Sequence, residues 1–585
     1  MHAAARFAER PAVTMLGGAA RDRATRMLSY RALLDRVNQA ANTFRRLGLA
    51  PDESVALLLP TLPETLIALW GAECAGRACP INYMLSAEQI AAILQAARAR
   101  ILVILGPDAG LSIWQKLDDI RRLAPELTHV LVVAGDRDIP PETGTIAFDD
   151  ALAASAPELA FARSLDRDDI ASYFHTGGST GAPKLVAHTH GNEVHASWFM
   201  GCYFGMDSGD ALINGFPLFH VAGAICYGSG CVAAGAHIVI PSPLGMRDRG
   251  FVANYWRIVD AFGITLLNAG PTFLTTILDL PSSRPSRHVR GIISGGSTLP
   301  ADLAEAAEAR LGIPLRSVYG MTETCGVLTV EPLGAPRSRQ SVGWPLPYSR
   351  IRLLDPRRES GATSVETPVE MGVVAARGPQ ITPGYSDARR NAELFTADGW
   401  LITGDLGSYD KDGRLLLRGR SKDVIIRGGH NIDPVGIEDA LMRHPAVQLC
   451  AAVGQPDPYA GELPVAFVVL KPGVETGLDA ILAAVRDDIP EPAAVPKRLY
   501  VLPALPTTAT GKILRPALRR MAAERIIAEE VTRLMPDVPA RISCIEEALQ
   551  DLVVVEVAAA VPETTLAALR DEVASYRLRF DIRLS

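Results

Sequence analysis

Hydrophobic and polar positions along the first 300 residues predict strands and helices in turn. Ser86 and Gln89 form a capping-box pattern that opens a helix over residues 87–98. The short apolar run 101–105 then predicts a buried strand. Another helix ends at Gly312, a typical stop residue. This alternation is typical of an α/β fold with largely parallel sheets.

The pattern changes near residue 419. Downstream, helices and strands of mixed order predict a compact α+β unit and then a long helix over 517–534. The last residues predict a small β-α-β unit, with strands 552–557 and 578–582 around a helix over 563–575. We therefore expect a large N-terminal α/β domain of packed mixed sheets over 1–419. A small, mobile α+β domain over 420–535 and a tail of unknown role over 536–585 are expected to follow.

Composition and charge narrow the function classes. The chain has 585 residues and a net charge of −7, which argues against a dedicated nucleic-acid binder. Eight cysteines are too sparse for a disulfide scaffold. Arg6, Glu9 and Arg10 interrupt the apolar core that a signal peptide needs. We expect a cytoplasmic protein with reduced cysteines.

Residues 211–246 carry no Asp, Glu, Lys or Arg. A charge-free run of this length is compatible with a membrane span. Its glycines, together with Asn214, Pro217 and His220, disfavour a membrane helix because Gly and Pro are costly inside helices. A loop, a buried helix and a strand over 236–240 fit the run better.

A glycine-rich segment carries the strongest local signal for chemistry. It runs from Thr176 through Gly177, Gly178, Ser179, Thr180 and Gly181 to Lys184. Backbone N–H groups of such a turn can bind a polyphosphate, with hydroxyls and one cation beside them. It is not a Walker A loop, because Pro183 precedes Lys184 and Leu185 follows it.

The same segment permits two other interpretations. Residues 177–181 also fit G-x-S-x-G, the nucleophile elbow of α/β-hydrolases, which needs an acid and a histidine downstream. A plain surface loop is the third. The segment alone leaves all three open.

Segments later in the chain favour the phosphate-binding interpretation over the other two. Residues 319–324, Tyr-Gly-Met-Thr-Glu-Thr, place an aromatic ring, hydroxyls and a carboxylate on one turn, which suit adenine, phosphate and Mg²⁺. Asp405 in 400–406 is suited to ribose hydroxyls. Residues 419–423 and 427–434 follow, and 505–515 place Lys512 after a loop.

In this order, the segments resemble the adenylate-forming superfamily: acyl-CoA synthetases, luciferases and peptide-synthetase adenylation domains. The resemblance covers about residues 5–525 and displaces the hydrolase interpretation. It implies an AMP-forming acid–thiol ligase that uses ATP, Mg²⁺ and coenzyme A. The tail has no counterpart, Gly177 replaces a usual Ser, and Leu185 replaces a usual Gly.

The resemblance also implies roles for individual residues. The nucleotide-binding set comprises Thr176, Gly177, Gly178, Ser179, Thr180, Gly181 and Lys184 of the phosphate loop, Gly295, Gly296 and Ser297 beside adenine, Tyr319 stacked on adenine, Gly320, and Asp405 and Arg420 on the ribose. The catalytic set comprises Lys512, bridging the acid and the α-phosphate, Thr322 at that phosphate, Glu323 as the Mg²⁺ ligand and His220 near the acyl carboxylate. The hinge and thiol-tunnel set comprises Lys422, Gly428 and Gly429.

The acyl pocket is expected around the charge-free run. Its expected members are His220, Val221, Gly270, Gly296 and Gly320, and the expected wall segments carry no Lys or Arg. This favours a fatty or other apolar monocarboxylic acid. Coenzyme A is the favoured acceptor because no carrier domain follows. A stand-alone enzyme that loads a carrier protein, and a non-catalytic acyl- or nucleotide-binding protein, are the alternatives. A homodimer is left open.

Overall fold

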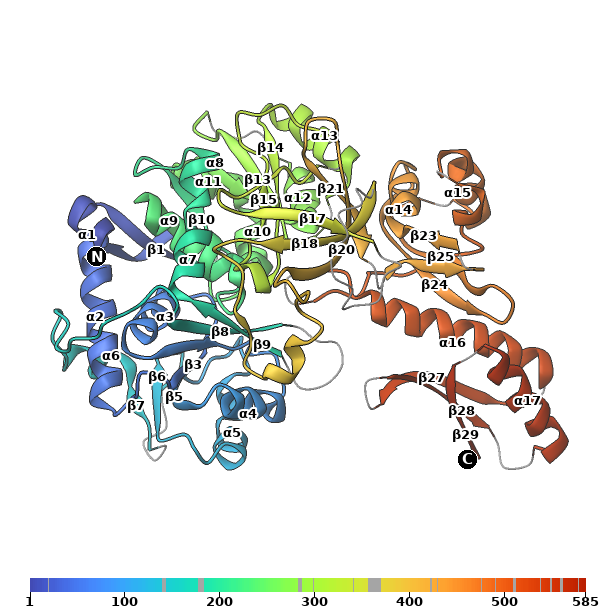
Figure 1. The fold of residues 1–585 in the computed structure, drawn as a ribbon, viewed down its shortest axis with the longest axis horizontal. Coiled ribbons are helices and arrows are strands. Elements are labelled where there is room, and N and C mark those ends of the chain that lie inside the picture. The colour runs from blue at the N-terminus through green and yellow to red at the C-terminus, as the bar shows by residue number, and fades with distance from the viewer. Residues whose placement is uncertain are drawn as a thin grey trace.

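The structure is a computed structural model that describes most of the chain. The described residues are 1–18, 20–138, 144–176, 184–281, 287–297, 299–339, 341–355, 370–420, 423–428, 430–474, 476–489, 491–508, 512–536, 538–547, 550–557, 561–576 and 578–584. Figure 1 shows a large N-terminal part, with a smaller C-terminal part beside it.

The first large sheet has the order β16-β15-β14-β13-β12-β10-β11-β1-β2. Its inner strands pair in parallel, from β14 through β13, β12, β10 and β11 to β1. β2, β15 and β16 join in antiparallel pairing at the two edges. The bounds are β1 Pro11–Gly17, β2 Arg23–Ser29, β10 Ala211–Ile213, β11 His237–Ile240, β12 Leu266–Asn268, β13 Gly291–Gly295, β14 Leu315–Tyr319, β15 Thr329–Val330 and β16 Trp344–Pro345.

The second large sheet has the order β19-β9-β8-β4-β3-β5-β6-β7. Pairing is parallel from β8 to β7, whereas β8–β9 and β9–β19 are antiparallel. The bounds are β3 Ser54–Leu58, β4 Arg77–Pro80, β5 Ala99–Leu105, β6 His129–Val133, β7 Ile146–Ala147, β8 Ile170–Thr176, β9 Lys184–Thr189 and β19 Gly384–Tyr385.

Helices cover these sheets, and an extended apolar core joins them. Buried residues of both sheets, such as Val55 in β3 and Ile238 in β11, belong to one cluster. The helix expected after Ser86 is present as α4, with its capping box. The helices are α1 His2–Phe7, α2 Tyr30–Arg46, α3 Pro63–Ala75, α4 Ala87–Ala96, α5 Leu117–Leu123, α6 Phe148–Ala153, α7 His190–Ser197, α8 Phe199–Phe204, α9 Gly230–Ala234, α10 Arg249–Ala253, α11 Tyr255–Ala261, α12 Pro271–Leu278 and α13 Ala301–Leu311.

The charge-free run is folded into the large part. It contains β10, the π-helix η2 (Ala222–Ser229), α9 and β11, and most of these residues are buried. The expected loop, buried helix and strand are therefore confirmed. Within the described ranges, every helix is too short or too polar to cross a bilayer. The eight cysteines are all described and all free.

A third, antiparallel sheet leads toward the C-terminal part. Its order is β17-β18-β20-β21, with bounds Arg350–Leu354, Met371–Arg377, Leu401–Tyr409 and Leu415–Arg420. The next sheet runs β23-β22-β25-β24, and β26 pairs with β25. Its elements are β22 Ile425–Arg427, β23 His430–Ile432, α14 Pro434–Met442, β24 Val447–Asp457, β25 Gly461–Leu470, α15 Leu478–Val485 and β26 Leu499–Val501. The expected fold class, a large α/β part and a smaller α+β part, is confirmed.

The last residues form a sheet with the order β27-β28-β29, packed with α17 against the long helix α16 (Figure 1). β28 pairs antiparallel with β27 and parallel with β29. The expected β-α-β unit is therefore incomplete, because the sequence analysis missed the strand β27. The bounds are α16 Arg515–Leu534, β27 Ala540–Glu547, β28 Gln550–Val557, α17 Glu563–Ser575 and β29 Arg579–Leu584.

Candidate active site

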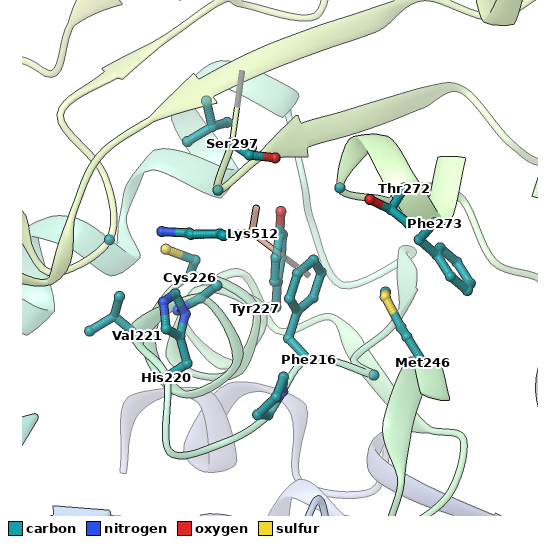
Figure 2. A pocket seen from close by; sticks show the side chains of 18 of the residues that line it. Phe216, His220, Val221, Cys226, Tyr227, Met246, Thr272, Phe273, Ser297 and Lys512 are labelled. Atoms are coloured by element: carbon teal, nitrogen blue, oxygen red, sulfur yellow. The ribbon is translucent and has the colours of Figure 1, made fainter. Parts of the chain in front are cut away.

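A cavity of about 280 Å³ lies where the charge-free run meets the carboxyl ends of β13 and β14. Its wall includes expected residues from distant segments: His220, Val221, Gly270, Gly295, Gly296, Ser297, Gly320, Thr322 and Lys512. Figure 2 shows Lys512 extending between Ser297 on one side and Cys226 and His220 on the other. Ligands of α/β sheets commonly bind at the carboxyl ends of parallel strands, as here.

The turn after β13 is built from glycines because its backbone lies close to its neighbours. A Cβ on Gly295 would lie 2.7 Å from the Val318 carbonyl oxygen of β14. Gly296 has φ +87°, which favours glycine, and a Cβ there would lie 4.0 Å from Cε of Lys512. Lys512 therefore reaches the strand end where the nucleotide is expected.

The turn that carries Thr322 and Glu323 is held from two directions. Nε2 of the buried His188 lies 2.7 Å from the Thr322 carbonyl oxygen and donates to it. The backbone N–H of Thr382 donates to the Glu323 carbonyl oxygen at 3.0 Å. The Tyr385 hydroxyl donates to Oε1 of Glu323 at 2.8 Å. The carboxylate is thus buried and oriented before any ligand binds.

Glu323 fits the Mg²⁺ site that the sequence implies. Within the described ranges, no cluster of three or more His, Cys, Asp or Glu side chains offers a complete metal cage. Mg²⁺ keeps several waters and is usually held by one or two carboxylates together with substrate phosphates. A single oriented carboxylate beside a nucleotide site matches that donor set.

Asp405 is fixed through both carboxylate oxygens. Tyr319 donates its hydroxyl to Oδ2 at 2.6 Å, and Nε of Arg420 lies 3.0 Å from Oδ1. Burial and the Asp405 charge raise the pKa of Tyr319 well above its usual value, so the phenol stays protonated and donates. Adenine stacking by Tyr319 and ribose binding by Asp405 and Arg420 stay predictions.

Lys512 lies among these charges. Burial, and then the nearby Arg420, lower its pKa, while Asp405 and Glu323 act in the opposite direction. Its ammonium is therefore poorly solvated and balanced by two carboxylates. Such a cation can interact strongly with an incoming anion, because water does not screen it.

His220 is expected to be neutral at the cavity wall. Burial, followed by the positive Lys512 and His175, lowers the pKa of His220 to about 3. Its Nδ1 accepts the backbone N–H of Ala222 at 3.2 Å, so the neutral ring carries its proton on Nε2. The ring can therefore donate one hydrogen bond without bringing a charge.

The remainder of the cavity wall is mainly apolar. Phe216 stacks on Tyr227 with ring centroids 5.2 Å apart, and Met246 and Phe273 lie beside them (Figure 2). Arg247, the first residue after the charge-free run, also lines the cavity. Its contribution was missed because the charge-free run ends one residue earlier.

The described ends of the glycine-rich segment lie at a strand pair. Thr176 and Lys184 are register partners in β8 and β9, and Nζ of Lys184 lies 5.1 Å from the Tyr385 ring centroid. The expected phosphate-binding residues between them fall outside the described ranges: Gly177, Gly178, Ser179, Thr180 and Gly181.

The expected hinge and thiol-tunnel residues are only partly described. Lys422 and Gly429 lie outside the described residues. Gly428 has φ +58° between β22 and β23, and its N–H donates to the Ala460 carbonyl oxygen at 2.6 Å. It is not part of the described cavity wall, so the structure does not bring it to Lys512.

Sequence reasoning also missed His188 and Tyr385. Both act through Thr322 and Glu323, which are 134 and 62 residues away along the chain. His188 lies in β9 and Tyr385 in the short strand β19, and neither strand has a sequence pattern that indicates a site residue. Only the pairing of β9 with β19 brings them under the same turn.

Comparison with known proteins gives consistent relatives. The chain is 34% identical over 541 residues to a marinolic acid–CoA ligase from Pseudoalteromonas sp. (strain SANK 73390), covering 91% of this chain and 82% of that protein. It is 28% identical over 546 residues to a long-chain-fatty-acid–CoA ligase from Bacillus subtilis (strain 168), covering 89% and 93%. The solved structure of an anthranilate CoA ligase with anthranoyl-AMP is 26% identical, with a TM-score of 0.78 and coverage of 89% and 96%.

Two family profiles match in chain order. Residues 1–386 match the AMP-binding enzyme family, and residues 436–512 match the AMP-binding enzyme C-terminal domain. The first match alone covers more than half of the chain. The chain therefore belongs to the AMP-binding enzyme family.

Proposed function

We propose that this protein activates an apolar monocarboxylic acid with ATP and transfers the acyl group to coenzyme A. The observation that carries the proposal is the position of Lys512. Its side chain lines the same cavity as Gly296 and Thr322 on the nucleotide side and as the apolar wall on the other. A cation at that junction is placed for a reaction between a carboxylate and a phosphate.

The first step forms the acyl-adenylate. A carboxylate oxygen of the acid attacks the α-phosphorus of ATP, and pyrophosphate leaves with the electron pair of the broken P–O bond. Two anions must approach each other, so neutralisation of charge and positioning provide the catalysis. Lys512 binds the carboxylate and the α-phosphate, while Thr322 contacts that phosphate. Mg²⁺ at Glu323 neutralises phosphate charge when it is bound.

The second step forms the thioester. The thiolate of coenzyme A attacks the acyl carbon, and AMP leaves with the electrons of the acyl–oxygen bond. Because Gly428 is not at the described cavity in this structure, this step needs the C-terminal part to turn. We propose that it turns near Lys422 and brings the region of Gly428 and Gly429 to the adenylate. Closure of this kind also excludes water.

The apolar cavity supports the substrate class. Phe216, Tyr227, Met246 and Phe273 offer large apolar surface, and carboxylate side chains are absent from the described wall. An amino acid would need such a carboxylate for its ammonium group. The relatives that act on long-chain fatty acid and on anthranilate show that the family accepts both aliphatic and aryl acids.

We also propose the domain boundaries that the sequence suggests: 1–419, 420–535 and 536–585. The two family matches support the first boundary. The apolar core of the last sheet extends across the second boundary, because Ile527 and Val531 of α16 belong to it. A cytoplasmic location and a homodimer remain expectations from the sequence.

The test is a panel of carboxylic acids assayed for pyrophosphate release, with and without coenzyme A. We expect release with apolar acids and coenzyme A consumption in equal amount. Release with no coenzyme A consumption under any condition would indicate a carrier protein as acceptor. Absence of pyrophosphate with every acid would overturn the proposal and favour a binding protein on the same fold.

A further inference from the structure

The acyl cavity has a second cation that the reaction does not use. Among the described residues that line it, Lys512 and Arg247 carry positive charge, and none is an Asp or Glu. Lys512 is assigned to the reacting carboxylate and phosphate. Arg247 therefore adds an uncompensated charge to a wall that is otherwise mainly apolar.

Arg247 directly follows Met246, which lies away from the reacting end. Figure 2 shows Lys512 on one side of the pocket and Met246, the residue before Arg247, on the other, with Phe216 and Tyr227 between them. The Met246 N–H donates to the Gly215 carbonyl oxygen at 3.0 Å. A Cβ on Gly245 would lie 2.1 Å from that oxygen, so the backbone is closely packed there. The backbone that leads into Arg247 is thus closely packed.

The Arg247 side chain is exposed, and two contacts orient it without neutralising its charge. Nη2 donates to the Tyr83 hydroxyl at 2.5 Å, and Nη1 lies 3.1 Å from Sδ of Met84. Tyr83 is only 5% exposed, and its ring packs edge-on against Phe219 with centroids 5.6 Å apart. No ion pair is recorded for Arg247 within the described ranges, and a guanidinium has five N–H donors. Donors therefore remain available to a ligand.

The nearest carboxylate in sequence is engaged elsewhere. Asp248 pairs with Nε of Arg21 at 3.0 Å, and its Oδ1 accepts the N–H of Phe251 at 2.9 Å. Arg21 and Phe251 thus hold Asp248 as the cap of α10. Asp248 therefore does not neutralise Arg247, and the exposed guanidinium can meet a polar group of a ligand at the cavity wall.

We propose that the acid activated by this protein has an apolar body and an oxygen acceptor, anionic or neutral, at the end remote from the reacting carboxylate. Arg247 binds that oxygen and thereby selects the substrate. This inference rests on the proposed ligase reaction and changes its substrate class from a purely apolar monocarboxylic acid to an acid with a second polar group, because a simple fatty acid has no acceptor for Arg247. A carboxylate at that end would match the planar guanidinium best, and a hydroxyl would use one donor.

The experiment compares acids of equal chain length, from six to twelve carbons, that end in a methyl, a hydroxyl or a second carboxyl group. Pyrophosphate release gives kcat/KM for each acid. We expect wild type to prefer a polar-ended acid over its methyl-ended counterpart by about 10- to 100-fold, the range for hydrogen bonds to a charged group. A larger gain for the carboxyl than for the hydroxyl acid would identify the acceptor as anionic, and the reverse as neutral.

The variant Arg247→Met should remove this preference, and Arg247→Lys should keep part of it for the carboxyl acid. Arg249→Met is the matched control, because Arg249 is exposed, two residues away and outside the described cavity wall. Its acid preference should equal that of wild type. Melting temperatures of all variants establish that each is folded.

Three results would overturn the inference. Wild type that activates methyl-ended acids at least as well as polar-ended ones would refute the role of Arg247 and leave the proposed function intact. A preference that survives in Arg247→Met would assign it to another residue. Wild type that releases no pyrophosphate with any acid would refute the proposed function itself, and this inference with it.

Discussion

The charges around Lys512 suit the first step of the proposed reaction, the formation of the acyl-adenylate. Lys512 is half-buried near Asp405, Glu323 and Arg420, which bind or face the nucleotide in the proposed mechanism. The acyl-adenylate already contains the bond that Lys512 helps to form. The lysine should therefore matter for making the adenylate and not for consuming it.

We predict that Lys512→Ala lowers adenylate formation by about 10²- to 10³-fold, the loss typical of one preorganised charge at a reacting centre. Thioester formation from supplied acyl-adenylate should keep most of its rate. Pyrophosphate exchange measures the first step, and acyl-CoA production measures the second. Equal loss in both steps would show that Lys512 acts on binding or folding instead.

Tyr385 forms a hydrogen bond with the Glu323 carboxylate. Its hydroxyl holds Oε1 of the carboxylate at 2.8 Å, so Tyr385→Phe should free Glu323 to rotate. We expect the Mg²⁺ concentration for half-maximal adenylation to rise about 10- to 100-fold, as for other residues that orient metal ligands. Tyr459→Phe is the control, because Tyr459 is 100% exposed. An unchanged Mg²⁺ dependence in Tyr385→Phe would remove Glu323 or its tyrosine partner from the metal site.

At the scale of elements, α16 connects two apolar cores. Leu518 and Ala522 belong to the core under β24 and β25, whereas Ile527 and Val531 belong to the core of the last sheet. The last sheet and the small C-terminal part therefore share one helix. They are expected to move together if the C-terminal part turns.

We predict that Ile527→Ala loosens the last sheet. Removing a fully buried isoleucine side chain costs about 2–5 kcal/mol, which corresponds to at least about 30-fold faster amide exchange in β28. All six tryptophans lie at or before residue 400, so their fluorescence is not a direct probe of this sheet and hydrogen exchange is the suitable measurement. Ile545→Ala is the control, because Ile545 is 42% exposed. Equal exchange in wild type and Ile527→Ala would show that α16 does not support β28.

Several elements were predictable from sequence because their signals are local. The cap at Ser86, the stop at Gly312 and the helix α14 each depend on a few neighbouring residues. The strand β27 was missed, since its eight residues, Ala-Arg-Ile-Ser-Cys-Ile-Glu-Glu, do not keep a regular alternation of apolar and polar positions and pair along only one edge. Local patterns do not show which strand will supply a partner.

The candidate site residues also fall into those with a local sequence signal and those without one. Thr322, Glu323, Asp405 and Lys512 were found because they stand in recognisable motifs, although their roles still await experiment. The contacts of His188 and Tyr385 with the turn that carries Thr322 and Glu323 depend on long-range strand pairing. Arg247 does not belong to a recognisable motif. Its proposed role in substrate selection depends on the cavity that its side chain lines. The missing information was therefore three-dimensional proximity.

For the whole molecule, Gly428 tests the proposed turning of the C-terminal part. Among the described residues, no atom outside Gly428 and its chain neighbours lies within 4 Å of a Cβ built there, so a side chain can begin there without an immediate clash. We predict that Gly428→Phe lowers thioester formation about 100-fold by obstructing the thiol path, while pyrophosphate release keeps most of its rate. This is the opposite of the pattern expected for Lys512→Ala.

The matched control is Gly473→Phe. Gly473 also has a positive φ, +77°, and open space around its Cβ position, but it lies in a turn after β25. It reproduces the backbone strain of the substitution without touching the proposed thiol path. If both variants lose thioester formation alike, strain and not obstruction is the cause.

The composition of the cavity wall has an evolutionary consequence. Among the described residues, those that line it all precede residue 330, with Lys512 as the exception. The apolar residues that line the cavity thus lie in the same segment of the gene as Thr322, whereas Lys512 comes from another segment. Substitutions of apolar lining residues such as Phe216 or Met246 should change which acid is preferred while leaving Lys512 and Thr322 in place. If the C-terminal segment is replaced by that of a relative, the preference of the protein among acids should stay unchanged.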